Sequence, residues 1–409
     1  MGYEGRKVVH YLKQTTVLPM LNLTKLYGGL SQPADALRYG HGHGAPKTAA
    51  ERRPIVVWNI TRRCNLKCLH CYSNSDAQFY PGELNWDQMT RVVDDLAAFK
   101  VPAVLLSGGE PMIHPRFFDL ASLVRQTGLR LTISTNGTRI DEAAAERLKE
   151  IGVTYVGISL DGIGETHDRF RGRDGTFEKV KAAFRNCRKV EQKVGLRLTL
   201  TQHTIDDLES ILDFIEDNEI NRVCFYHLVY SGRGGDLQDV GPADVRRALD
   251  RIMDRTKSWI EGGQAREVLT VDQPADGAYM LLRMKREQSE RFDDVRSMLE
   301  WNGGGRFSSG TGIGNIDTQG NVHPDQFWQA LNLGNVKERP FSEIWTQNDD
   351  PTLAGLRDRL PLLKGRCRDC RFQKVCGGGF RVRALQAHGD PWADDPGCYL
   401  TDDEVKTGI

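Results

Sequence analysis

The sequence has no excess of charge of either sign and no long hydrophobic run. Its 409 residues include 55 lysines and arginines against 55 aspartates and glutamates. This balance argues against a polybasic protein that binds nucleic acid. No apolar stretch approaches the roughly 20 residues that a helix needs to cross a bilayer. The first 20 residues also lack the apolar core of a signal peptide. We therefore expect a cytoplasmic protein with neither a nucleic-acid nor a membrane partner.

Cysteine is present in a pattern that points to metal chemistry. The chain has 9 cysteines, an odd number, and structural disulfides are rare in the cytosol. Two of them, Cys187 and Cys224, stand alone, and we expect both to be buried packing residues. The other seven form two groups, Cys64, Cys68 and Cys71 as C-x3-C-x2-C, and Cys367, Cys370, Cys376 and Cys398 near the end of the chain. These groups predict two metal or cluster sites.

From residue 54, short β-rich segments alternate with amphipathic helical segments. The pattern predicts strands over 55–58, 103–106, 131–134, 155–160, 196–200 and 222–225. It predicts helices over 86–99, 116–126, 141–151, 176–194, 205–218 and 242–261. Six such units in series imply parallel strands with right-handed crossovers. We expect an α/β fold with a partial (β/α)6 barrel, related to the (β/α)8 barrel. Periodicity alone leaves a doubly wound sheet open as the alternative.

Changes in composition and in secondary-structure pattern along the sequence predict four regions. Residues 1–53 are rich in Gly, Pro and His and are expected to form an N-terminal arm. The partial barrel occupies 54–261, and a charged helical bridge is expected over 262–305. Residues 306–409 are expected to form a small C-terminal domain with short strands and a Cys-rich tail. Because such a tail cannot build a hydrophobic core of its own, a metal cluster is expected to organise it.

The first cysteine group directly follows the first predicted strand. In a barrel, this places three thiolates on a loop at the carboxyl ends of the strands, where barrel chemistry occurs. Three thiolates suit an iron–sulfur cluster with one open iron, whereas structural zinc needs a fourth ligand. The only nearby candidate is His70, which adjoins Cys71 and is badly placed for the same metal. The first group therefore predicts a 4Fe–4S cluster.

Three further motifs stand at the ends of the next strands. They are Gly108-Gly109-Glu110, Ser134-Thr-Asn136 and Ser159-Leu-Asp161. Paired glycines allow close backbone approach to a ligand, and a carboxylate can accept a hydrogen bond from an ammonium group. A hydroxyl and an amide can bind ribose. Together with the cysteine group, these motifs predict a site for a bound small molecule.

In this order, the motifs resemble those of the radical S-adenosylmethionine superfamily over about residues 54–260. The resemblance implies that Cys64, Cys68 and Cys71 hold a 4Fe–4S cluster whose open iron binds the methionine group of the cofactor. Reductive cleavage then gives a 5′-deoxyadenosyl radical that abstracts a substrate hydrogen. A small electron donor, such as a ferredoxin or flavodoxin, is an implied partner. The implied cofactor-binding residues are His70, Tyr72, Gly108, Gly109, Glu110, Ser134, Asn136, Ser159 and Asp161.

The four tail cysteines are enough to close a metal site. Zinc is one interpretation, although the C-x2-C-x5-C spacing is unlike that of paired zinc hairpins. The tail resembles the SPASM extension of radical enzymes, which implies an auxiliary 4Fe–4S cluster and two clusters in all. Related peptide-modifying enzymes carry one more cluster, but here Ser309 and Asp325 occupy the positions of its cysteines. We predict that His323 and Asp325 act there, as an axial ligand or a proton donor to an iron macrocycle.

Stretches 55–64, 322–328 and 395–400 resemble the haem-modifying branch of the superfamily. That branch serves the sirohaem-dependent haem pathway and the haem d1 pathway. Stretches 23–40, 223–230 and 269–277 favour the former, in which both acetate groups of didecarboxysirohaem are lost. The alternatives are propionate loss in the haem d1 pathway, a peptide maturase and a non-enzymatic scaffold. Arginines that follow the fourth and sixth strands are predicted to bind the carboxylates of an iron tetrapyrrole, namely Arg169, Arg171, Arg173 and Arg233.

Overall fold

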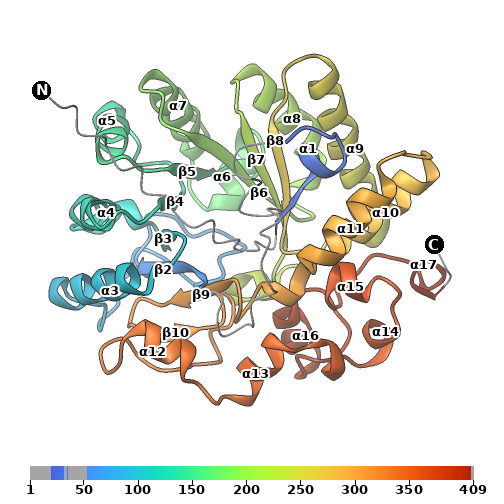
Figure 1. Ribbon diagram of the computed structural model, residues 1–409. Helices are drawn as coiled ribbons and strands as arrows, with labels where there is room; N and C mark the ends of the chain where they lie inside the picture. Colours follow the sequence, from blue (N-terminus) through green and yellow to red (C-terminus); the bar gives the residue numbers. More distant parts are fainter. Residues whose placement is uncertain (1–19, 32–34, 36–52, 407–409) are drawn as a thin grey trace, which may run out of the picture.

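A computed structural model describes residues 20–31, 35 and 53–406. All six predicted strands are present, and they form neighbouring parallel strands of one sheet. They are β2 (Ile55–Thr61), β3 (Val104–Gly108), β4 (Leu131–Thr135), β5 (Tyr155–Ser159), β6 (Val194–Leu200) and β7 (Arg222–His227). The choice between the two predicted architectures is settled in favour of the partial barrel, with helices arranged around the outside of the strands (Figure 1).

The first and the last of the helices that follow these strands begin at residues suited to that position. Asn85 caps the first of them and forms a capping box with Gln88, and Pro242 stands in the first turn of the last. The helices are α3 (Trp86–Phe99), α4 (Phe117–Gln126), α5 (Glu142–Ile151), α6 (Glu165–Arg171), α7 (Thr176–Lys189), α8 (Leu208–Asp217) and α9 (Pro242–Glu261). Their apolar faces pack on the sheet to form the main core.

The prediction that residues 262–305 form a helical bridge was wrong in one respect, because this region begins with a strand. This strand is β8 (Glu267–Val271), which pairs in parallel with β7 and precedes the helices α10 (Ala275–Arg286) and α11 (Phe292–Asn302). On the other side, β9 (Ile313–Ile316) pairs in parallel with β2. The barrel wall therefore contains strands from both the bridge and the C-terminal region.

Short antiparallel strands end the sheet on both sides. They are β1 (Met20–Asn22), which pairs with β8, and β10 (Val322–His323), which pairs with β9. Among the described strands these two stand at opposite ends of the order, so the barrel is open. Part of the predicted arm is thus ordered as β1 and the helix α1 (Leu23–Leu26). The rest of it, 1–19, 32–34 and 36–52, lies outside the described residues.

Beyond β9 and β10, the C-terminal region consists of short helices joined by loops (Figure 1). These are α12 (Phe341–Thr346), α13 (Pro351–Arg357), α14 (Gly365–Arg368), α15 (Gln373–Cys376), α16 (Arg381–His388) and α17 (Asp402–Lys406). Within the ranges that the structure describes, no helix combines the length and the apolar character that crossing a membrane requires. Cys187 and Cys224 are buried, as predicted.

Candidate active site

The carboxyl ends of the parallel strands surround a cavity of about 190 Å³. The structure brings most of the predicted site residues to its wall, although they come from segments far apart in the sequence. Those that line it are Cys64, Cys68, His70, Cys71, Tyr72, Gly108, Gly109, Ser134, Asn136, Ser159, Arg171 and Arg233. Parallel strands place their carboxyl ends at one edge of the sheet, which explains this convergence.

The cysteine loop after β2 is held by hydrogen bonds to distant segments. Its backbone amides donate from Cys64 to the Asp76 carbonyl (2.7 Å) and from Leu69 to the Phe170 carbonyl (3.0 Å). The Arg233 guanidinium donates to two loop carbonyls, those of Cys68 (2.8 Å) and Ser75 (2.9 Å). The loop is therefore fixed by a hydrogen bond within itself and by contacts with the end of α6 and with the segment that follows β7.

The three thiols of this loop suit a cluster that is held at one cavity wall. Backbone amides donate to the sulfur atoms of Cys64 and Cys71, each at 3.4 Å, and the Arg171 guanidinium donates to Cys68 Sγ at 3.6 Å. Burial raises the pKa of the Cys64 thiol to about 12, so iron binding must displace its proton. The donors would stabilise the resulting thiolates.

Gly108 and Gly109 allow β3 to end directly against the cysteine loop. Gly108 has φ +135°, and a Cβ atom there would lie 2.3 Å from the Thr61 carbonyl oxygen. A Cβ atom on Gly109 would lie 2.3 Å from the Arg63 carbonyl oxygen. No side chain can be accommodated at either position without moving backbone. The two glycines therefore let bare backbone form this part of the cavity wall.

Glu110 has a different position from the one that its predicted role requires. Its carboxylate is fully buried and accepts hydrogen bonds from the Met112 amide (3.0 Å), the Asn136 amide (2.7 Å) and the Thr135 hydroxyl (2.8 Å). Glu110 is not among the described residues that line the cavity. Burial raises the pKa of Glu110, and its three donors oppose that shift. The residue joins the ends of β3 and β4 and thereby positions the cavity wall.

Asp161, like Glu110, makes its contacts with other residues of the protein. It forms a buried ion pair with Arg171 and accepts a hydrogen bond from the Thr199 amide (2.7 Å). Although burial acts to raise it, the Arg171 guanidinium holds the pKa of Asp161 below its usual value. It is absent from the described cavity lining. Arg171, which was predicted to bind substrate, is thus occupied by Asp161 and Cys68.

His70 and Tyr72 line the cavity beside the cysteines. The His70 ring stacks on Phe170, with centroids 4.6 Å apart and planes inclined by 18°. Burial lowers the pKa of His70 to about 4, so its imidazole is neutral near pH 7 and suits stacking. The Tyr72 hydroxyl donates to Asn59 Oδ1 at 3.1 Å. These two rings give the wall near the cysteines an aromatic character.

The predicted roles of His323 and Asp325 do not fit their positions. His323 uses both ring nitrogens within its hairpin, with Nδ1 2.7 Å from the Leu331 carbonyl oxygen and Nε2 3.3 Å from Asp317. Asp325 binds the Ser309 hydroxyl and the Phe327 amide. Neither is among the described lining residues. The side chains of Arg169 and Arg173 are exposed and also lie outside that lining.

The cavity also contains residues that the sequence prediction missed. They come from β6, from the end of β7, from directly after β8 and from the segment after β10, and include Arg197, Tyr226, His227, Asp272 and Phe327. The guanidinium of Arg197 donates to the Tyr226 hydroxyl at 2.9 Å. A position at the end of a strand was a usable criterion for Tyr226 and His227, whereas Arg197 lies in the middle of β6. Asp272 could not be found in this way, because β8 was not predicted.

The four tail cysteines line a second cavity. The Gly379 amide donates to Cys376 Sγ (3.1 Å), and the Arg366 guanidinium donates to Cys398 Sγ (3.3 Å). Within the described ranges, no three His, Cys, Asp or Glu side chains gather closely enough to hold one metal ion. Four thiols placed around a cavity are better suited to a cubane cluster, in which each thiolate binds a different iron, than to a single zinc ion.

An open parallel barrel with three cysteines after its first strand, followed by a Cys-rich extension, defines a radical S-adenosylmethionine (AdoMet) enzyme with a SPASM domain. The chain belongs to the radical SAM superfamily. Residues 58–215 match the model of that superfamily, and residues 310–371 match the SPASM model, an iron–sulfur cluster-binding domain. Its cofactors are accordingly AdoMet and a 4Fe–4S cluster, with further iron–sulfur binding in the SPASM domain.

Two curated relatives are each 46% identical to this chain. Fe-coproporphyrin III synthase of Methanosarcina barkeri matches over 94% of this chain and 99% of its own length. Pre-heme d1 synthase of Dinoroseobacter shibae matches over 87% and 88%. Both support the resemblance to the haem-modifying branch that the sequence motifs indicated.

Solved structures with the same fold come from proteins that are more distant in sequence. SuiB of Streptococcus suis bound to S-adenosylmethionine gives a TM-score of 0.67 at 18% identity, over 86% of this chain and 78% of SuiB. A structure described as native anSMEcpe with bound AdoMet gives 0.64 at 21% identity, over 84% and 93%. These likenesses establish the fold.

Proposed function

We propose that this chain is a radical SAM enzyme that converts 12,18-didecarboxysirohaem to Fe-coproporphyrin III by removing two acetate side chains. The observation that carries the proposal is the 46% identity to Fe-coproporphyrin III synthase over almost the whole of both chains. The cavity supports it, because three thiols and a set of polar strand ends face one space at the barrel mouth.

In this proposal, Cys64, Cys68 and Cys71 hold one 4Fe–4S cluster, and the four tail cysteines hold the second. Backbone at Gly108 and Gly109, together with Ser134, Asn136, Ser159, His70 and Tyr72, binds AdoMet. When bound, the reduced cluster and AdoMet supply the radical that takes a hydrogen atom from the substrate. Glu110 and Asp161 position this machinery, because each holds neighbouring residues of the wall and lies behind it.

The part of the cavity that is lined by β6, by the residues at the ends of β7 and β8 and by the segment after β10 is proposed to hold the tetrapyrrole. The cavity contains the guanidinium groups of Arg171, Arg197 and Arg233. All three hydrogen-bond to protein atoms, yet their charges still make the cavity favourable for a polycarboxylate. The rings of Tyr226 and Phe327 supply apolar surface for a macrocycle.

The second candidate is the haem d1 reaction, in which propionates are lost from the same substrate. Pre-heme d1 synthase has the same identity to this chain, but it aligns over a smaller share of both chains. This difference in coverage favours acetate loss. A peptide maturase is disfavoured because Ser309 and Asp325 hydrogen-bond to each other at the place where such enzymes carry cluster cysteines.

Mass analysis of the tetrapyrrole after anaerobic incubation tests the proposal. The protein is incubated with didecarboxysirohaem, AdoMet and a chemical reductant. We expect a product that has lost both acetate groups and retains its propionates. Loss of propionates would establish the haem d1 reaction instead. A variant with Cys64, Cys68 and Cys71 all replaced by alanine is the matched control, and it should form no 5′-deoxyadenosine and no product.

We also propose a ferredoxin or flavodoxin as the electron donor and a cytoplasmic location. Both follow from the proposed chemistry, which needs a one-electron reductant and the reducing conditions of the cytosol. Replacement of the chemical reductant by a reduced flavodoxin, with 5′-deoxyadenosine formation as the measurement, tests the donor.

A further inference from the structure

Asp272 is a buried residue at the cavity wall, and its carboxylate has no partner among the described residues. Its side chain follows the end of β8, and only 5% of the residue is exposed. Among the described residues, no hydrogen bond or ion pair reaches its carboxylate, and the single contact of the residue is made by its backbone oxygen. A buried carboxylate without donors is costly, and proteins retain such groups mainly where a ligand satisfies them.

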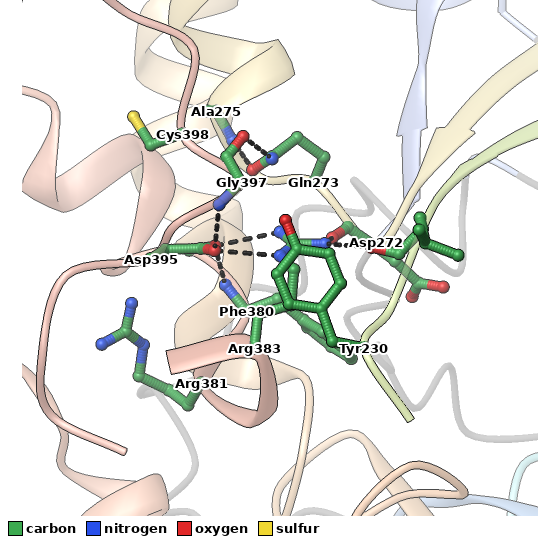
Figure 2. Close-up of polar contacts among 12 residues, drawn as sticks. Tyr230, Asp272, Gln273, Ala275, Phe380, Arg381, Arg383, Asp395, Gly397 and Cys398 are labelled. Carbon is green, nitrogen blue, oxygen red and sulfur yellow. Dashed lines mark hydrogen bonds and ion pairs between the residues drawn. The ribbon is translucent and has the colours of Figure 1, made fainter. Parts of the chain in front are cut away.

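The backbone of Asp272 is held firmly in an uncommon conformation. Its φ angle is +65°, in the left-handed region that few residues other than glycine adopt. The Arg383 guanidinium donates to the Asp272 carbonyl (2.8 Å) and forms a two-point ion pair with Asp395 (2.9 Å for each contact). The next residue, Gln273, donates to the Gly397 carbonyl (2.6 Å). Figure 2 shows Arg383 between Asp395 and Asp272. Backbone strain that surrounding contacts maintain is typical of functional positions.

The charges around Asp272 come from four different elements. They are Arg197 on β6, His227 on β7, Asp325 after β10 and Arg383 on α16. Burial raises the pKa of Asp272 to about 7, and the repulsion from Asp325 adds to that shift, while the two arginines and His227 oppose it. The carboxyl group therefore changes protonation near neutral pH, and a further negative charge nearby would favour its neutral form.

The strand order separates Asp272 from the proposed AdoMet site. In the sheet, β8 stands five positions from β3, whose Gly108 begins the glycine pair, and three positions from β5, which carries Ser159. Asp272 thus belongs to the wall that also contains Arg197, Tyr226 and Phe327. In the proposed function this wall faces the tetrapyrrole, whose side chains carry carboxylates.

We propose that Asp272 binds the tetrapyrrole as a carboxylic acid, donating a hydrogen bond to one of the substrate's carboxylate groups, so that substrate binding takes up a proton. This inference rests on the proposed function, because it requires a polycarboxylate ligand. An acid–carboxylate pair shares one proton and avoids the repulsion between two anions. The arginines would neutralise other substrate carboxylates, whereas Asp272 would recognise one carboxylate by donating a hydrogen bond.

Calorimetry of tetrapyrrole binding in two buffers of different ionisation enthalpy measures the proton uptake. The experiment uses anaerobic protein with its clusters, and S-adenosylhomocysteine in place of AdoMet to prevent turnover. For the parent we expect uptake approaching one proton per didecarboxysirohaem at about pH 8 and falling toward zero below about pH 6. The sign follows because free Asp272 is largely ionised at the higher pH and already protonated at the lower.

Asp272→Asn is the discriminating variant. Asparagine tolerates the positive φ angle and retains a hydrogen-bond donor, but it cannot take up a proton. It should bind the tetrapyrrole within about threefold of the parent at about pH 6 while the proton uptake disappears. Asp272→Leu, which has no donor, should bind at least about tenfold more weakly. Asp213→Asn, which changes an exposed carboxylate on α8, is the matched control and should take up protons like the parent.

Three results would overturn the inference, and they are distinguishable. A parent protein that binds didecarboxysirohaem without proton uptake, or an Asp272→Asn variant that retains the uptake, would refute the role of Asp272 and leave the proposed function intact. A parent protein that does not bind didecarboxysirohaem would refute the proposed function and the inference together.

Discussion

The Glu110 carboxylate connects two strand ends that the cofactor is proposed to touch. Glu110→Ala would leave two backbone amides and the Thr135 hydroxyl without acceptors, at about 1–3 kcal/mol for each buried group. We expect the free energy of unfolding to fall by at least about 2 kcal/mol. We also expect AdoMet affinity to fall at least about tenfold, because the backbone amide of Asn136 loses the partner that positions it. Chemical denaturation and an AdoMet titration measure the two effects. Lost affinity with unchanged stability would instead indicate a direct contact between Glu110 and AdoMet.

His167 gives the stability of the protein a measurable dependence on pH. Burial lowers the pKa of His167 from 6.5 to about 4, and its Nδ1 accepts a hydrogen bond from the Asp161 amide at 3.1 Å. The unfolded chain therefore binds one more proton than the folded protein between these pH values. The free energy of unfolding should fall as pH drops through this window, by up to about 1.4 kcal/mol per pH unit from this residue.

Replacement of His167 by asparagine isolates this effect. The asparagine carbonyl can accept the hydrogen bond from the Asp161 amide, but it does not titrate. Thermal unfolding of both proteins between about pH 7 and pH 4 should show a smaller loss of stability for the variant. Parallel curves for the two proteins would show that His167 takes up its proton over the same pH range in the folded and unfolded states.

At the scale of elements, α1 is attached to the start of β8 by one hydroxyl. Thr24 Oγ1 donates to the Arg266 carbonyl (2.6 Å) and accepts from the Val268 amide (2.9 Å), and Thr24 is fully buried. Thr24→Val keeps the shape and removes both hydrogen bonds, so we expect a loss of about 1–3 kcal/mol in chemical denaturation. Thr24→Ser retains the hydroxyl and should lose less. Equal stability of the two variants would contradict this account.

The regular elements could be predicted where sequence periodicity is long enough. The bounds of α3 and α9 agree with the sequence prediction, because both helices have long amphipathic patterns. Strand β8 was missed for a physical reason. All of its five residues are buried, so it has no alternation of polar and apolar side chains, and it lies between two helices. β1 has only three residues, too few for any period.

The site could be predicted only as far as strand ends could be located. The cysteine loop and the motifs after β3, β4 and β5 meet because parallel strands share one edge. The direction of a side chain beyond a strand end depends on local contacts that sequence spacing does not specify. His323 was therefore assigned to the active site although its hairpin uses both nitrogens. Asp272 was missed because its strand was missed.

For the whole molecule, the two cysteine groups predict two clusters. Anaerobic reconstitution should give about eight irons per chain. Replacement of Cys64, Cys68 and Cys71 together by alanine should leave about four irons and abolish AdoMet cleavage. Iron and sulfide analysis with a 5′-deoxyadenosine assay measures both. Zinc at the tail of protein purified anaerobically would contradict the second cluster.

The ion pair between Arg383 and Asp395 connects the barrel mouth to the Cys-rich tail. Asp395 stands three residues before Cys398, and Arg383 holds the backbone of Asp272. Coupling between two binding events is reciprocal. If the tail cluster stabilises the cavity for its ligand, then a ligand bound in the cavity must stabilise the tail cluster by the same free energy. Occupancy of the barrel should then raise the affinity of the tail for its iron, so that more iron remains bound at equilibrium with a chelator and cofactor retention becomes a reporter of substrate binding.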